Sequence, residues 1–172
     1  HLERDLRTSR AELVRRYVVA NELNPTTVNP PDAWIGIISS GFTYHELIHA
    51  LNALGLKSQH EIASAGIRLL HLQLPIPFDP QNIRNFANGL EEIIVVEEKN
   101  PTAEWLVKDA LYGNSHQPRV LGKNHPDGRI LMPSHGILDA NTMLEGLHER
   151  LSQKIPDKLR PPQKLEQIKN LL

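Results

Sequence analysis

Three short apolar runs, each ending at polar residues, dominate the hydrophobic pattern of this chain. The runs cover residues 34–38, 67–72 and 93–96, and amphipathic segments separate them. Short runs rich in β-branched residues, alternating with helical patterns, are typical of a parallel sheet that is covered by helices. We therefore expect an α/β fold: a three-layer α/β/α sandwich whose mostly parallel sheet has about five strands and an antiparallel edge.

Helices are expected on both sides of this central region. Residues 6–23 have apolar positions at a spacing compatible with an amphipathic helix, and residues 101–112 fit another. Asp139 is a suitable N-cap for a further helix that runs to about Leu151, with its apolar residues on one face.

A hairpin is a candidate for the segment between the last two predicted helices. Residues 119–122 and 130–132 are apolar enough to form short strands, and the Asp127-Gly128 pair between them favours a turn.

Proline-containing breaks divide the chain into three parts. We expect residues 1–32 to be a helix and linker that follow a preceding domain, residues 33–151 to be the core domain, and residues 152–172 to be a linker with a short helix. The chain begins at His1 and not at Met. Together with the linker-like ends, this predicts a middle domain taken from a longer polypeptide.

Composition narrows the classes of function. The chain has 19 basic and 20 acidic residues, a net charge of -1 and no basic block, which argues against nucleic acid or an anionic membrane as partners. It has no cysteine, which excludes disulfides and cysteine-held iron–sulfur clusters within these residues. It suits a reducing environment, so we expect a cytoplasmic protein. No apolar run approaches the roughly 18 residues that span a bilayer.

One motif suggests a metal site. His45, Glu46 and His49 form the His-Glu-x-x-His pattern, in which two imidazoles on one helix face bind zinc and the glutamate acts as general base. A third protein ligand is not fixed by the spacing. The apolar stripe of this helix lies away from His45 and Glu46, so we expect a solvated helix face and no metal. A zinc-dependent hydrolase is the alternative.

The residues that follow the apolar runs are the other candidates. Ser39, Ser40 and Gly41 precede a helix N-terminus, which suits an anion but equally a turn or an N-cap. Glu97 and Glu98 end the third run, where they could bond to a helix N-terminus or a subunit, or act in acid–base catalysis. Since the sequence provides no nucleophile beside them, we interpret all five as interface or anion-binding candidates. A free-standing anion- or nucleotide-binding module is a further alternative.

Taken in order, the motifs resemble one known family, over about residues 12–151. The chain is similar to the transketolase C-terminal-like domain of the indolepyruvate ferredoxin oxidoreductases, which belong to the 2-oxoacid:ferredoxin oxidoreductases. The resemblance rests on Ile35-Gly-Ile-Ile-Ser-Ser-Gly41, Gly66-Ile67-Arg68-Leu69-Leu70, Pro75-Ile76-Pro77, Val95-Val96-Glu97-Glu98-Lys99, Gly122-Lys123 and Leu131-Met132-Pro133.

The resemblance implies a thiamine-diphosphate-dependent parent enzyme. Such enzymes oxidatively decarboxylate aryl 2-oxoacids such as indolepyruvate to acyl-coenzyme A, and electrons pass through iron–sulfur clusters to ferredoxin. Thiamine diphosphate and Mg²⁺ bind to other domains of these enzymes, and this chain has no Gly-Asp-Gly segment for them. We therefore expect a non-catalytic structural domain without a catalytic residue, cofactor or metal. Its partners would be other domains or subunits of the enzyme, which the resemblance implies to be a homodimer.

Overall fold

A five-stranded sheet forms the centre of the computed structural model, which describes residues 2–162. The strands are β1 (Thr26–Val28), β2 (Ile35–Ser40), β3 (Ile67–Leu72), β4 (Glu92–Val96) and β5 (Arg119–Leu121). Their order across the sheet is β1-β3-β2-β4-β5; β1 pairs antiparallel with β3, and all other neighbours are parallel. The predicted mostly parallel sheet with one antiparallel edge is confirmed.

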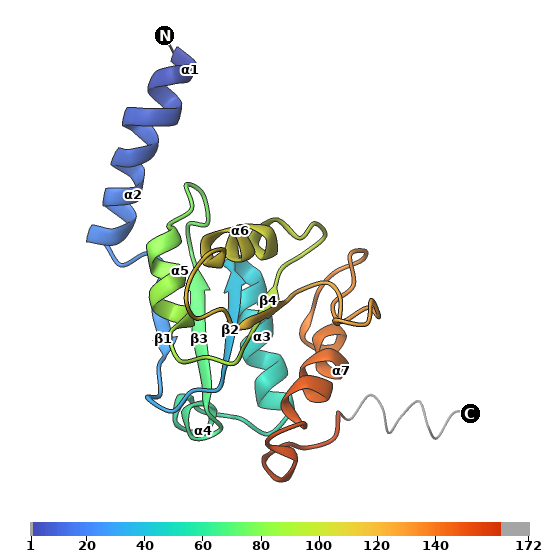
Figure 1. The fold of residues 1–172 in the computed structure, drawn as a ribbon. Coiled ribbons are helices and arrows are strands. Elements are labelled where there is room, and N and C mark those ends of the chain that lie inside the picture. Colours follow the sequence, from blue (N-terminus) through green and yellow to red (C-terminus); the bar gives the residue numbers. More distant parts are fainter. Residues whose placement is uncertain (1, 163–172) are drawn as a thin grey trace.

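Helices cover both faces of this sheet (Figure 1). The helical elements are α1 (Leu2–Asp5), the π-helical turn η1 (Leu6–Arg10), α2 (Ala11–Ala20), α3 (Gly41–Ala53), α4 (Gln59–Ser64), α5 (Pro80–Ala87), α6 (Thr102–Leu111), α7 (Ala140–Leu151) and the 3-10 turn η2 (Pro156–Lys158). Helices α3, α4 and α7 pack on one face, and α5 and α6 pack on the other. This is the expected three-layer sandwich. Within the described residues, no helix combines the length and the apolar character needed to cross a bilayer.

The strands divide their side chains between two apolar cores because successive residues of a strand point to opposite faces. Ile37 and Leu69 are fully buried in the core beneath α3 and α7. Their neighbours Ile38 and Leu70 are fully buried in the core beneath α5 and α6. The continuous apolar runs of the sequence thus reflect strands that are buried on both faces.

The predicted helices are present. The segment expected at 6–23 forms η1 and α2, which extend away from the sandwich (Figure 1). The segment expected at 101–112 forms α6. Asp139 caps α7 as predicted, since its carboxylate accepts a 2.8 Å hydrogen bond from the N–H of Thr142.

Two local predictions are wrong. Strand β1 lies inside the segment expected to be helix and linker, where it adds the antiparallel edge to the sheet. The expected hairpin is absent: β5 pairs in parallel with β4, and only an isolated bridge joins Asn124 to Ile130. Around the predicted Asp127-Gly128 turn, the N–H groups of His125 and Leu131 donate to the carbonyls of Arg129 and Lys123, at 2.8 Å each. A turn is therefore present where the sequence predicted one, without a two-stranded hairpin.

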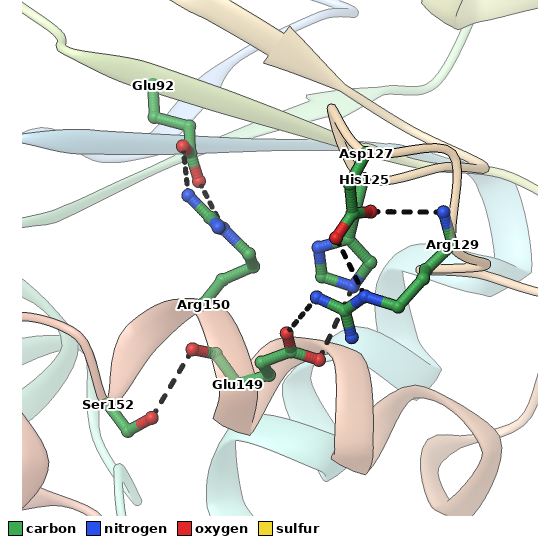
Figure 2. A network of polar contacts seen from close by, with 7 residues as sticks. All are labelled: Glu92, His125, Asp127, Arg129, Glu149, Arg150 and Ser152. Carbon is green, nitrogen blue, oxygen red and sulfur yellow. Dashed lines mark hydrogen bonds and ion pairs between the residues drawn. The ribbon is translucent and has the colours of Figure 1, made fainter.

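A buried ion pair fastens α7 to the sheet (Figure 2). Arg150 donates from Nε and Nη2 to the two carboxylate oxygens of Glu92, at 2.9 and 2.5 Å. The two side chains are only 10% and 8% exposed. Next to this pair, Glu149 accepts a 2.9 Å bond from Arg129 and lies 3.4 Å from the buried ring of His125. These contacts hold the loop that follows β5 against α7.

Candidate functional site

The carboxyl ends of the parallel strands lie at one edge of the sheet, and the residues singled out in the sequence meet there. Ser39, near the end of β2, is in register with His71 on β3 and with Val96 on β4. Glu97 and Glu98 follow β4 directly. The structure therefore brings the Ser-Gly segment and the two glutamates to the same edge.

The Ser-Gly segment divides into a buried and an exposed part. Ser39 is buried, and its hydroxyl donates a 2.9 Å hydrogen bond to the carbonyl of Val96, which joins the ends of β2 and β4. Ser40 has an extended backbone before α3, but its side chain makes no capping bond. Gly41 is exposed with a φ of +51°. The Ser39 side chain thus stabilises the fold, whereas Ser40 and Gly41 are accessible from solvent.

Glu97 caps the helix that follows it. Its carboxylate is buried and accepts 2.8 Å hydrogen bonds from the N–H groups of Ala103 and Glu104, in the first turn of α6. Burial raises the pKa of Glu97 above its ordinary value, and the two N–H bonds oppose that shift. Of the roles considered for the two glutamates, Glu97 has the bond to a helix N-terminus, whereas Glu98 is exposed.

A second buried polar group, Lys123, completes this contact, although no sequence pattern singled it out as a site. The N–H of Lys123 donates to Glu104 at 3.0 Å, and its ammonium group donates to the carbonyl of Glu97. Burial lowers the pKa of Lys123, and the charges of Glu97 and Glu104 oppose the shift. A Cβ on Gly122 would overlap the carboxylate of Glu104, so glycine allows this close approach. In the sequence, the one local feature of this contact is the Gly122-Lys123 pair directly after the short strand β5.

Three rings cluster between α3 and the end of β3. Tyr44 stacks on His71 with 4.0 Å between ring centroids, and His45 approaches His71 edge-on at 5.8 Å. The hydroxyl of Tyr44 shares a 2.6 Å hydrogen bond with Thr27 on β1. Burial lowers the pKa of His71, and the nearby charge of His45 lowers it further. The spacing of the sequence gave no reason to join Tyr44 to His71, since they are 27 positions apart.

The His-Glu-x-x-His motif has a structural use. Glu46 accepts a 2.9 Å hydrogen bond from the N–H of Ala140, the first residue of α7, and so fastens that helix to α3. His49 is exposed and lies 3.6 Å from Glu46, while His45 belongs to the ring cluster. In the part of the chain that the structure describes, no three His, Asp or Glu side chains are grouped as metal ligands. Glu46, which a zinc hydrolase would use as general base, instead accepts a hydrogen bond from the N-terminus of α7.

The polar groups at this edge of the sheet are therefore used to hold the fold together. A nucleophile needs a base within hydrogen-bond reach, and a general base must accept a proton from substrate. The Ser39 hydroxyl instead donates to a main-chain carbonyl, and the Glu97 carboxylate accepts from main-chain N–H groups. Both side chains thus stabilise the fold at this edge.

Comparisons of the sequence with a family model and with curated proteins point to the same family. Residues 26–171 match the model of the family described as "Indolepyruvate oxidoreductase domain". The chain is similar to indolepyruvate oxidoreductase subunit IorA of Pyrococcus horikoshii, at 28% identity over 137 residues, which is 79% of this chain and 20% of that protein. It is also 28% identical over 160 residues to the subunit of the same name from Thermococcus kodakarensis, covering 84% of this chain and 23% of that protein. The chain thus spans about a fifth of the length of these curated relatives.

The chain is also similar to a solved structure. It is described as "Split gene transketolase, inactive beta4 tetramer", with a TM-score of 0.48 and 17% sequence identity, and the match covers 76% of this chain and 42% of that one.

Proposed function

This chain belongs to the indolepyruvate oxidoreductase domain family, and we propose that it is the non-catalytic, interface-forming domain of a thiamine-diphosphate-dependent indolepyruvate:ferredoxin oxidoreductase. The whole enzyme would decarboxylate aryl 2-oxoacids oxidatively to acyl-coenzyme A and deliver electrons to ferredoxin. Thiamine diphosphate, Mg²⁺ and the iron–sulfur clusters would bind to other parts of this cytoplasmic enzyme. The family match and the similarity to the two subunits support the proposal.

The internal use of the strand-end polar groups carries the non-catalytic part of the proposal. In an α/β sheet, ligands usually meet groups at the carboxyl ends of the strands. Here the side chains of Ser39 and Glu97 form hydrogen bonds with the main chain of neighbouring elements. Disturbing either group to bind substrate would open the fold, so these residues are better suited to positioning than to chemistry.

Exposed apolar side chains at the same edge support a docking role. Phe42 follows β2 and is 72% exposed, and Ile76 follows β3 and is 62% exposed. Ile137 is 74% exposed in a loop that Lys99, after β4, holds through a 2.7 Å hydrogen bond to the carbonyl of Gly136. We call Phe42, Ile76 and Ile137 the carboxyl-edge surface. Large apolar side chains that gather at one exposed edge are typical of contact sites. The proposed partners are the cofactor-binding parts of the enzyme and a second protomer.

Titration of the 172-residue chain with thiamine diphosphate and Mg²⁺ tests the absence of cofactor binding. Isothermal titration calorimetry should detect no saturable binding to the chain, whereas the whole enzyme, as the positive control, should bind. Saturable binding to the chain at micromolar concentrations would refute this division of labour.

Charge substitutions test the carboxyl-edge surface. Phe42→Glu or Ile76→Glu should weaken assembly of the whole enzyme, measured by analytical ultracentrifugation, because a carboxylate would be buried at the interface without a partner. Tyr112→Glu is the matched control, since Tyr112 is 86% exposed at the opposite end of α6. Equal assembly of all three variants would show that this edge makes no contact with a partner.

A further inference from the structure

Arg68 is a buried cation on the face of the sheet that α5 covers. It is the second residue of β3 and only 8% exposed. Its Nη1 donates to the main-chain carbonyls of Phe86 and Asn88, at 2.6 and 2.8 Å, where α5 ends. Arg68 therefore caps the C-terminus of this helix.

The cap does not balance the charge of Arg68. A helix C-terminus supplies roughly half a negative charge against the full positive charge of a guanidinium. Within residues 2–162, no carboxylate pairs with Arg68, and its buried Nε has no hydrogen-bond partner. Arg150, which is similarly buried, has the carboxylate of Glu92 for this purpose. A buried charge without a counter-charge is unfavourable, and burial accordingly lowers the pKa of Arg68.

An open cavity of about 290 Å³ lies against Arg68. Its other walls are Thr26, Asn29, Asn82, Asn85, Phe86 and Asn88. Four of these are asparagines, so the walls offer neutral amide donors and, among the described residues that line it, no carboxylate. The cavity therefore combines an uncompensated cation with donors that would not repel an anion.

The occupied atoms of the asparagines leave donors for a ligand. Asn85 accepts a 2.9 Å bond from Gln81 through Oδ1, which is the acceptor of its amide and leaves the NH₂ group outside that bond. Asn82 uses Nδ2 to donate 3.0 Å to the carbonyl of Asn24, so it contributes less. A second cavity of about 580 Å³ shares Thr26, Asn82 and Asn85 with the first and extends it along α5.

We propose that this cavity binds the phosphate group of a small molecule, with Arg68 as its counter-charge and the asparagine amides as further donors. Guanidinium groups and amides are well matched to the several acceptor oxygens of a phosphate. The adjoining cavity would hold the body of the molecule. The site lies between β1, β3 and α5, near the amino end of β3, so it is separate from the carboxyl-edge surface and does not depend on the proposed function.

Binding of radiolabelled inorganic phosphate to the native full-length protein, measured by equilibrium dialysis, tests the proposal. The wild type should show a saturable site whose affinity falls at least about tenfold in Arg68→Met. Asn85→Asp should cause a comparable loss, because it places a carboxylate at the cavity while its oxygen still accepts the bond from Gln81. Arg84→Met is the matched control: Arg84 donates 3.0 Å to the carbonyl of Ala110 at the end of α6, outside the cavity. Phosphate affinity of this control should stay within about twofold of the wild type.

The outcomes separate a binding site from a purely structural arginine. If Arg68→Met fails to fold, Asn85→Asp decides the question alone, since Asn85 is exposed. Phosphate binding that is equal in the wild type, Arg68→Met and Asn85→Asp would overturn the proposal and leave Arg68 only as a helix cap. Absence of a saturable site in the wild type would overturn it as well, and release of a partner subunit by Arg68→Met would then assign the cavity to an acidic side chain of that subunit.

Discussion

Removing one partner of the Glu92–Arg150 ion pair should lower the free energy of unfolding more than removing one partner of an exposed ion pair. Arg150→Met keeps much of the volume of the side chain but leaves the Glu92 carboxylate behind, buried at the start of β4. The substitution also deletes both hydrogen bonds that fasten α7 to the sheet (Figure 2).

The size of the effect follows from the burial of the pair. Breaking a buried ion pair by removing one partner typically costs about 3–5 kcal/mol, because an uncompensated charge stays behind. Glu92 and Arg150 also line a cavity of about 490 Å³, through which water can reach the remaining carboxylate. We therefore expect the lower end, about 3 kcal/mol of the free energy of unfolding. The double variant Glu92→Leu/Arg150→Met should recover about 2 kcal/mol of this loss, since neither charge remains.

Urea denaturation followed by circular dichroism measures these differences. With an m-value of about 2 kcal/mol/M, the loss corresponds to a midpoint about 1.5 M lower for Arg150→Met. The control is Arg129→Met, which removes an exposed arginine of the same network and should change the free energy of unfolding little, because solvent screens its ion pairs. The reasoning would be refuted if Arg150→Met cost no more than this control, or if the double variant were less stable than Arg150→Met alone.

Three further predictions concern the groups around the carboxyl ends of the strands. The folded pKa of Glu97 is raised above 4.5, so its contribution to stability is full below pH 4.5 and is lost as pH rises through the raised value. Glu97→Gln should abolish that decline in urea denaturation between pH 4 and 7, and an unchanged slope would contradict the assignment. The folded pKa of His71 is lowered below 6.5, so the stability it contributes is present above pH 6.5 and is lost as pH falls through the lowered value. His71→Phe should therefore reduce acid destabilisation below pH 6.5, and a profile identical to wild type would argue against a half-buried neutral ring. Glu46→Ala should lower the free energy of unfolding by about 1 kcal/mol through loss of the bond to Ala140, with no loss of bound zinc in elemental analysis. Stoichiometric zinc in the wild type that disappears in His49→Ala would instead establish a metal site.

Local patterns were sufficient for most of the elements of secondary structure. The apolar run of β2 and the cap at Asp139 depend on neighbours within a few residues, so the sequence was sufficient to predict them. The family was also legible from the order of its motifs, and the match of residues 26–171 to the family model confirms it. β1 escaped prediction because it has only three residues and follows Pro25.

The roles of individual polar side chains depended on packing between elements. Glu46 meets the N-terminus of α7 across 94 positions, and Arg68 meets the end of α5 across about 20. No local spacing contains such partners, because helix and strand periods state which face a residue occupies but not what lies opposite. The amino-acid sequence by itself therefore determined the central strands, the main helices and the family. Only the tertiary structure decided that Ser39 and Glu97, at two strand ends, form internal hydrogen bonds, because folding buries them beside main-chain groups of other elements.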